Sequence, residues 1–145
     1  MQKWMVLILV FLGLVSPLKA YAAPLKLTLT EGVIQPIPYA APVFVAENRA
    51  AEDWSKKITA LVVQDLNSSG LFREVSKAKY ISQITSFASP VQYSDWKAIN
   101  VQALVTGAVK ISSKDQLVVK FRSYDVFAGQ ELGDGLQFVG TKDRW

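Results

Sequence analysis

Residues 52–70 constrain the fold most, because they describe one long amphipathic helix. Their apolar side chains recur at the i, i+4, i+7 and i+8 spacing that places residues on a single helix face. Glu52 or Asp53 can open the helix, and Gly70 supplies a common helix stop. The predicted buried face consists of Trp54, Ile58, Leu61, Val62 and Leu66.

Short apolar stretches flank this helix. Residues 43–46 precede it, and Leu71, Phe72 and Val75 follow it. The order strand, helix, strand favours a parallel pair of strands joined by a right-handed crossover. Residues 33–42 carry three prolines, which cannot donate to a β-ladder. We therefore expect an extended connector there rather than a central strand.

The second half of the chain predicts a β-hairpin. A short turn after Ser76 and a helix from Ser94, with Trp96 and Ile99 on its apolar face, precede it. Residues 103–111 form a buried strand, 112–116 a polar turn, and 117–123 an alternating antiparallel return. Leu132, Leu136 and Phe138 suggest a last strand, with Gly133 or Gly135 as a bulge, and Thr141 could cap a further helix. These elements together define a single α/β domain.

The first 22 residues have the pattern of a secretory signal peptide. Lys3 provides the positive start, residues 4–15 are apolar, and Pro17 ends the run. Ala20-Tyr21-Ala22 offers a cleavage pattern, so the mature chain is predicted to begin at Ala23. A retained membrane anchor is the alternative, but 12 apolar residues fall short of the roughly 20 that span a bilayer. We expect no integral membrane span after cleavage.

Composition narrows the chemistry of the remaining 123 residues. The sequence has no cysteine, so an exported chain must be stabilised by core packing alone. It also has no histidine, which removes the usual general base and zinc ligands. Removing Lys3 and Lys19 leaves 14 basic and 12 acidic side chains, a net charge of only +2. This balance argues against a nucleic-acid partner.

No motif points to catalysis or to a cofactor. The glycines form no phosphate-binding loop. Glu52 with Asp53, and Glu131 with Asp134, could work as acid and base pairs, but the first pair suits a helix start and the second a turn. Most aromatic side chains are better explained as core than as a ligand platform. We expect no catalytic residue, no cofactor and no metal.

The segment directly after the cleavage point carries the sharpest signal for binding. Three leucines alternate with polar residues, which is the period-2 pattern of a strand with one apolar face. Two interpretations stay open: an ordinary edge strand of the domain sheet, or a strand that adds to the sheet of a partner. The candidate partner-binding residues are Leu25, Lys26, Leu27, Thr28, Leu29, Thr30, Glu31 and Gly32.

Three phrases, in this order and spacing, resemble one family. They are DLNSSGLF at 65–72, DWKAIN with ALVTG across 95–107, and YDVFAGQ at 124–130. Together they resemble the amino-terminal domain of TolB, the periplasmic component of the Tol-Pal system. The resemblance covers essentially all of the mature chain. It implies a mixed sheet of about five strands with packed helices, followed in the family by a carboxy-terminal β-propeller that this sequence lacks.

The resemblance also implies a function. Members of this family are periplasmic, non-catalytic adaptors that support outer-membrane integrity, cell division and protein import. The carboxy-terminal domain of TolA binds their extreme amino-terminal segment, which corresponds to residues 25–32 here, whereas the lipoprotein Pal binds mainly the propeller. The expected organisation is a signal peptide at 1–22, a mobile partner-binding strand and linker at 23–36, and the α/β domain at 37–145.

A different class of protein is the alternative. A small exported ligand-binding or hydrolytic α/β domain could share this layout, and it would need a concave site with convergent polar groups. A deep pocket lined by Asp125, Tyr124 and a lysine would favour that interpretation.

Overall fold

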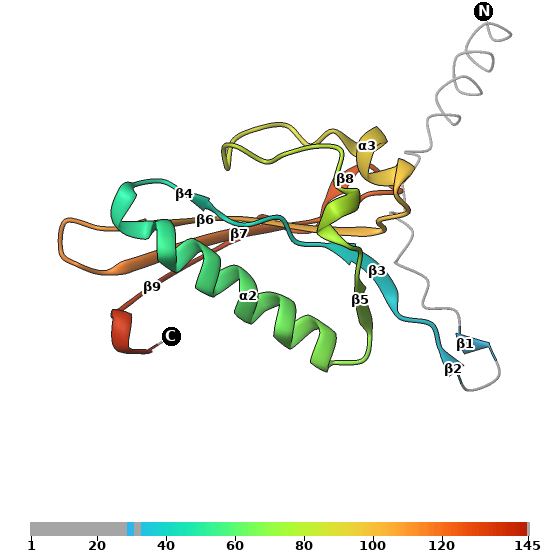
Figure 1. The fold of residues 1–145 in the computed structure, drawn as a ribbon, viewed down its shortest axis with the longest axis horizontal. Coiled ribbons are helices and arrows are strands. Elements are labelled where there is room, and N and C mark those ends of the chain that lie inside the picture. The colour runs from blue at the N-terminus through green and yellow to red at the C-terminus, as the bar shows by residue number, and fades with distance from the viewer. Residues whose placement is uncertain (1–28, 31–32, 145) are drawn as a thin grey trace, which may run out of the picture.

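A mixed sheet forms the body of the protein (Figure 1), and within the described residues it has seven strands. The computed structural model describes residues 29–30 and 33–144. One long helix, α2 (Glu52–Ser68), lies along one side of the sheet, and the short helix α3 (Tyr93–Ala98) lies on the other. The strands are β3 (Ile37–Ala40), β4 (Val45–Ala46), β5 (Phe72–Glu74), β6 (Ala103–Ile111), β7 (Leu117–Asp125), β8 (Gln130–Glu131) and β9 (Leu136–Gly140).

The predicted α/β class is confirmed. The sheet has seven strands instead of about five because two of them, β4 and β8, are only two residues long. The 3-10 turns η1 (Arg49–Ala51), η2 (Lys77–Lys79) and η3 (Lys142–Arg144) occur within the connections and near the carboxyl end. After Thr141, where the sequence suggested the start of a helix, the described residues form the short turn η3.

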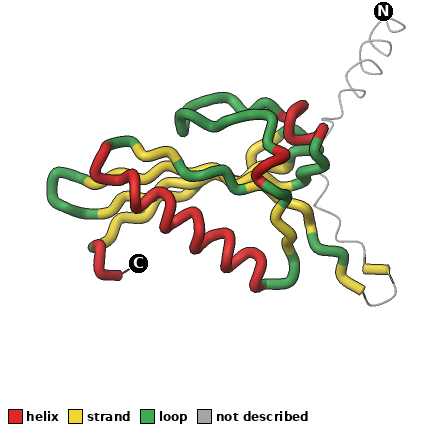
Figure 2. Tube along the Cα trace, in the orientation of Figure 1, coloured by secondary structure: helices red, strands yellow, loops and turns green. Residues whose placement is uncertain are grey.

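The strand order is β5-β3-β6-β7-β8, with β4 beside β6 and β9 beside β7. β3 runs parallel to both β5 and β6, whereas β6 and β7 form the predicted antiparallel hairpin from Ala103↔Asp125 to Ile111↔Leu117. Figure 2 shows these long yellow strands crossing behind the red helix. The β6–β7 hairpin therefore forms the centre of the sheet. β3, β4 and β5 lie on the β6 side of it, and β8 and β9 lie on the β7 side.

The expectation of a connector at 33–42 is wrong for residues 37–40, which form an internal strand. Ile37 N–H donates to Leu71 on the β5 side, and the Pro38 carbonyl accepts from Gln102 N–H on the β6 side. Backbone groups alternate sides along a strand, so the missing N–H of Pro38 faces the β6 side. The β3–β6 ladder begins only at Tyr39↔Ala103, and the proline therefore interrupts no ladder bond.

The predicted crossover connection was wrong in the identity of its first strand. The parallel partner of β5 is β3, whereas the expected first strand, observed at Val45–Ala46, pairs with β6. The chain thus passes from β3 through β4 and α2 to β5. The parallel pair was predicted, but its first member lies in the proline-containing segment.

Helix α2 begins at Glu52 and ends at Ser68, close to the predicted limits. Ile58 is buried as expected, but Leu61 is 43 % exposed, so its assignment to the buried face is wrong. At 100° per residue, Leu61 lies on the flank of a stripe whose centre is filled by Ser55, Ile58 and Thr59. Ser55 and Thr59 are buried although they are polar, so a pattern of apolar residues does not predict their positions on the buried face.

Thr59 explains why a hydroxyl is tolerated at the centre of this stripe. Its Oγ1 donates to the Ser55 carbonyl at 2.6 Å and accepts from the Phe44 backbone N–H at 2.9 Å. Phe44 N–H would otherwise be a buried donor in the connection between β3 and β4. One side chain therefore ties α2 to the sheet while satisfying its own hydrogen bonds.

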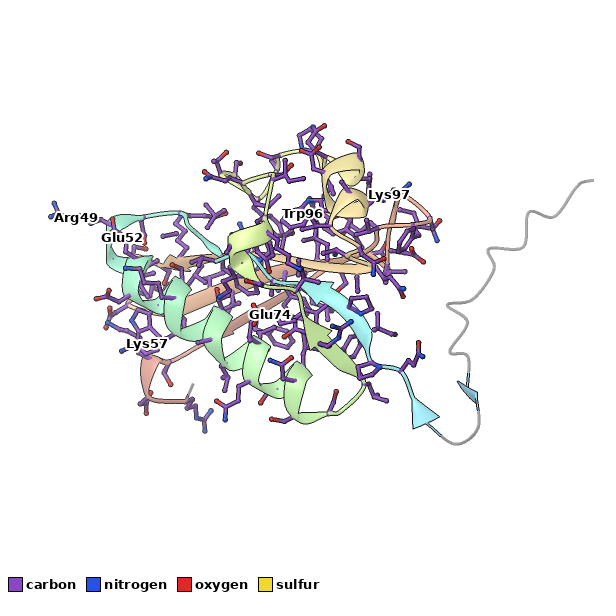
Figure 3. The ribbon with its side chains drawn as sticks, turned by 45° about the vertical axis from the view of Figure 1, so that its right-hand side comes forward. Arg49, Glu52, Lys57, Glu74, Trp96 and Lys97 are labelled. Atoms are coloured by element: carbon purple, nitrogen blue, oxygen red, sulfur yellow. The ribbon has the colours of Figure 1, made fainter. Side chains whose placement is uncertain are left out.

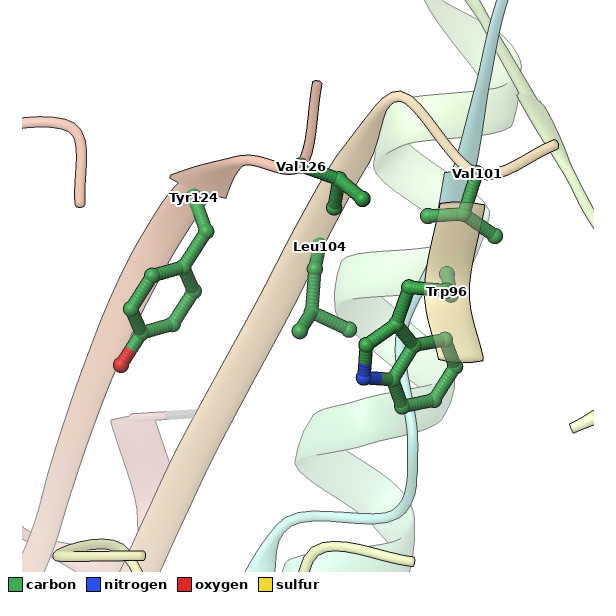
Figure 4. Packing of buried hydrophobic residues seen from close by; sticks show 6 residues of the cluster. Trp96, Val101, Leu104, Tyr124 and Val126 are labelled. Atoms are coloured by element: carbon green, nitrogen blue, oxygen red, sulfur yellow. The ribbon is translucent and has the colours of Figure 1, made fainter. Parts of the chain in front are cut away.

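Two hydrophobic clusters lie on opposite faces of the sheet. On the α2 face, Phe44 and Ile58 pack with Val109, Leu117 and Val119. On the α3 face, the fully buried Trp96 anchors the second cluster, as Figures 3 and 4 show. Its other buried members are Ala40, Val101, Leu104, Tyr124 and Val126. The predicted role of Trp96 on the apolar face of its helix is confirmed.

The predicted bulge before the last strand is also present. Leu132 N–H donates to Ser123, and Leu136 pairs with Phe121, so residues 133–135 stand opposite the single residue Arg122. Gly133 and Gly135 have φ of 75° and 70°, a region that glycine enters without steric cost. The bulge separates β8 from β9, and it directs β9 along the first half of β7.

Candidate partner-binding site

The predicted partner-binding segment lies mostly outside the described residues. Its described part is β1 (Leu29–Thr30), which pairs antiparallel with β2 (Val33–Ile34) in the register Leu29↔Ile34 and Thr30↔Val33. These two strands form a sheet of their own and do not join the seven-stranded sheet. Residues 25–28 and 31–32 lie outside the described residues.

The connection from this hairpin to the domain is short. Only Gln35 and Pro36 separate β2 from β3, which is an internal strand of the main sheet. Figure 1 draws β1 and β2 beyond the first residues of β3, outside the main sheet. The hairpin is thus attached directly to an internal strand of the sheet, and within the described part of the chain its strands pair only with each other.

The first acidic pair lies where it was predicted, whereas Glu131 of the second pair lies in the short strand β8 and not in a turn. Glu52 and Asp53 lie in the first turn of α2, where acidic side chains favour the helix dipole. Glu131 forms an ion pair with Arg122 at 3.3 Å, next to the glycine bulge that contains the exposed Asp134. Among residues 29–30 and 33–144, no group of three or more acidic side chains could hold a metal ion.

Tyr124 and Asp125, which were expected to line a deep pocket if this were a ligand-binding or hydrolytic domain, have structural roles in the described residues. Tyr124 is only 6 % exposed, packs in the α3-side cluster and meets Tyr93 edge to face. Asp125 Oδ1 accepts from Ala128 N–H at 2.8 Å and so closes the following turn. The shallow hollows beside β9 and β5 hold about 190 to 240 Å³, below the roughly 300 Å³ typical of ligand sites.

The pKa is raised for two tyrosines, the buried Tyr39 and the partly buried Tyr80, and both hydroxyls form hydrogen bonds within the fold. Burial raises the pKa of Tyr39 to about 12, and nearby Glu74 adds to the effect. Burial likewise raises the pKa of Tyr80 to about 12, although its hydroxyl accepts a hydrogen bond from Ala41 N–H. Tyr39 donates to the Val63 carbonyl of α2 at 3.2 Å. The Tyr39 hydroxyl thus links β3 to α2, and the Tyr80 hydroxyl links the segment after η2 to Ala41, the residue that follows β3.

One exposed feature was missed by the sequence interpretation. Phe138 and Val139 of β9 are 47 % and 53 % exposed, although Phe138 was expected in the core with most other aromatic residues. Phe138 stacks on Phe121 at 5.8 Å between ring centroids, so one face of its ring is covered. The uncharged run 136–140 was the available signal, because an edge strand without charge is unusual in a soluble domain.

The site and fold together define an α/β domain with helices on both faces of a mixed sheet, and its amino-terminal strands β1 and β2 lie outside that sheet. A sequence model of the TolB amino-terminal domain matches residues 25–132. The chain belongs to the TolB amino-terminal domain family, which confirms the resemblance seen in the sequence.

Relatives and solved structures agree with this assignment. The Tol-Pal system protein TolB of Roseobacter denitrificans is 54 % identical over 124 residues, covering 86 % of this chain and 28 % of the relative. Its namesake from Dinoroseobacter shibae is 55 % identical over 122 residues, covering 84 % and 27 %. The chain therefore spans less than a third of the length of these relatives.

The crystal structure of TolB from Acinetobacter baumannii is similar with a TM-score of 0.52 and 29 % identity, covering 74 % of this chain and 23 % of that one. The carboxy-terminal domain of LpoB from Salmonella enterica has a TM-score of 0.56 at 10 % identity, covering 77 % and 87 %. At that identity, the likeness concerns the fold alone.

Proposed function

We propose that this chain is a periplasmic, non-catalytic adaptor of the Tol-Pal system that binds the carboxy-terminal domain of TolA by strand addition through residues 25–32. The observation that carries the proposal is the pairing of β1 with β2 outside the main sheet. A terminal strand that is not part of the domain sheet can exchange its partner without breaking the core. Family membership and the Tol-Pal relatives support the choice of partner.

The remaining parts of the proposal concern export and the whole system. The sequence pattern of residues 1–22 supports export through a cleaved signal peptide, with the mature chain beginning at Ala23. In the described residues, no helix is long and apolar enough to cross a bilayer. Pal binding through a propeller, outer-membrane integrity and envelope constriction during division are expectations from the family resemblance, for a protein of the relatives' full length. We assign none of them to a residue of this chain.

Calorimetric titration tests the binding proposal. The mature chain and a variant lacking residues 23–32 are titrated with the TolA carboxy-terminal domain. We expect heat of binding from the intact chain and none from the shortened one, while circular dichroism shows both folded, because the two hydrophobic clusters begin at Ala40 and Phe44. Equal affinities for the two chains would refute the assignment of the binding segment.

A matched variant controls for effects on the rest of the domain. Leu61→Ala removes an exposed leucine from α2, far in sequence from residues 25–32. It should bind TolA as well as the unchanged chain. A loss of binding equal to that of the deletion would place the interface on the α2 side of the domain instead.

A further inference from the structure

An irregular segment crosses the face of the sheet that carries α3. Residues 81–92 connect η2 to α3 and contain neither helix nor strand. Figures 1 and 3 draw them as a long loop on the side of the sheet opposite α2. We call this segment the strap.

Two buried residues of β6 lie on the same side of the sheet as the strap. Thr106 and Ala108 are 4 % and 1 % exposed. Alternation along β6 places them on the face of Leu104, which belongs to the α3-side cluster. In the β6–β7 register they stand opposite Arg122 and Lys120. The side chains of these two cations therefore share the face that the strap crosses.

Phe87 joins the strap to both cations. The guanidinium carbon of Arg122 lies 4.6 Å from the Phe87 ring centroid, and Lys120 Nζ lies 5.9 Å from it. Arg122 Nη1 also donates to the Phe87 carbonyl at 3.4 Å. Each cation has an acidic partner, Glu47 at 3.1 Å from Lys120 and Glu131 at 3.3 Å from Arg122. The ring thus meets two positioned positive charges, and we call Phe87, Lys120 and Arg122 the latch.

The strap is attached to the sheet by side chains alone. Among the described residues, its backbone hydrogen bond runs from Ser89 N–H to the Ser86 carbonyl within the strap, and none reaches a strand. Ile84 and Val91 pack against the α3-side cluster but are only partly buried, and no residue of the strap is fully buried. Few buried contacts and no ladder are typical of a segment that opens before the rest of a domain unfolds.

Both ends of the strap are held more firmly than its middle. Tyr80, directly before the strap, packs edge to face on the buried Trp96 and accepts a hydrogen bond from Ala41 N–H. Near the first end, the Ser82 hydroxyl donates to Asp95 of α3. The second end continues into α3 itself. The middle of the strap therefore depends on the latch.

We propose that the strap opens from the sheet as a unit while the rest of the domain stays folded, and that the latch holds it closed. Opening uncovers Thr106, Ala108 and the adjoining α3-side cluster, so the strap gates this face of the sheet. The α2-side cluster contains no residue of the strap and stays intact. The proposal goes beyond the adaptor function and does not involve residues 25–32.

Thiol labelling of the mature chain tests the opening, because the sequence has no cysteine of its own. Ala108→Cys places one thiol under the strap. Val109→Cys is the matched control, since Val109 is the next residue of β6, is equally buried, and faces α2. The rate of reaction with an aromatic disulfide reagent is measured at increasing urea concentrations. Circular dichroism checks that both variants fold, and Thr106→Cys, which is nearly isosteric, replaces Ala108→Cys if that variant does not.

Local and global opening give different results in this measurement. We expect the thiol at position 108 to react at least about tenfold faster than the thiol at 109, because local opening needs less free energy than unfolding. Its rate should depend weakly on low urea concentrations, since little surface is exposed. Equal rates at the two positions with the same steep dependence on urea would overturn the proposal.

A change of Phe87 tests the latch. Phe87→Leu keeps an apolar side chain but removes the aromatic face, and it should speed labelling at position 108 about fivefold without changing the rate at 109. In a background of Lys120→Met and Arg122→Met, which keep the stems without the charges, the same change should alter the rate less than about twofold. An unchanged rate in Phe87→Leu, or an equal effect with and without the two charges, would refute the latch.

Discussion

Phe44 lies directly over Gly107: a Cβ added to Gly107 would stand 2.4 Å from Phe44 Cδ2. Gly107 is in the middle of β6, and the Phe44 ring is only 2 % exposed, held between the sheet and α2. Glycine is thus required here by close packing and not by backbone conformation. The contact joins the connection before β4 to the central hairpin.

Gly107→Ala should therefore destabilise the domain by about 1 to 3 kcal/mol, the usual cost of overpacking a filled core. Urea denaturation followed by circular dichroism measures this loss. In the double variant, Phe44→Leu should recover part of it, because the smaller side chain makes room for the new methyl group. Independent, additive losses in the two variants would show that the contact is not the cause.

The hydroxyl of Thr59 should matter more than its methyl group. Thr59→Val keeps the shape but leaves the Phe44 N–H without an acceptor, at a cost of about 1 to 3 kcal/mol. Thr59→Ser keeps the hydroxyl and should cost less. The free energies of unfolding of the three proteins check the order, and a valine variant as stable as the parent would contradict the role given to this bond.

Alkaline pH should weaken the fold between about pH 10 and pH 12. Burial raises the pKa of Tyr39 and of Tyr80 from 10.0 to about 12. The unfolded chain loses these protons near pH 10 while the folded chain keeps them, so stability is fully present below pH 10 and falls as the pH rises toward 12. Denaturation at pH 9 and at pH 11.5, repeated with Tyr39→Phe and Tyr80→Phe together, measures this. An equally steep loss in the double variant would assign it to other groups.

The leucines of the amino-terminal segment should dominate TolA binding. Burying one leucine is worth about 1.5 to 3 kcal/mol, so Leu27→Ala should weaken binding roughly tenfold to a hundredfold. Thr28→Ala, on the other face of the predicted strand, should have a much smaller effect. Titration calorimetry distinguishes the two, and equal effects would argue against an extended strand with one buried face.

Local periodicity predicted the elements whose neighbours are close in sequence. Helix α2, the β6–β7 hairpin and the glycine bulge all follow from the spacing of residues within one segment. The strand at Pro38 did not, because its position depends on where β6 begins, some 65 residues later. A proline disrupts a β-ladder only where a carbonyl of the neighbouring strand would accept a hydrogen bond from its missing N–H. The sequence alone does not show which strand is the neighbour.

Exposure was harder to predict than secondary structure. Phe138 lies opposite Val119 in the register of β7 and β9, yet Phe138 is 47 % exposed and Val119 only 2 %. The prediction for Leu61 fails because Ser55 and Thr59 fill the centre of the helix stripe. Of the candidate binding segment, the fold adds only that β1 pairs with β2 apart from the main sheet. Its role in binding stays a prediction.

Amide hydrogen exchange of residues 25–32 tests the central claim most directly. The mature chain is followed alone and with the TolA carboxy-terminal domain. The account predicts rapid exchange in the free chain and strong protection when TolA is added, while the amides of β6 and β7 are protected in both. Amides of residues 25–32 that are already protected in the free chain and do not respond to TolA would contradict it.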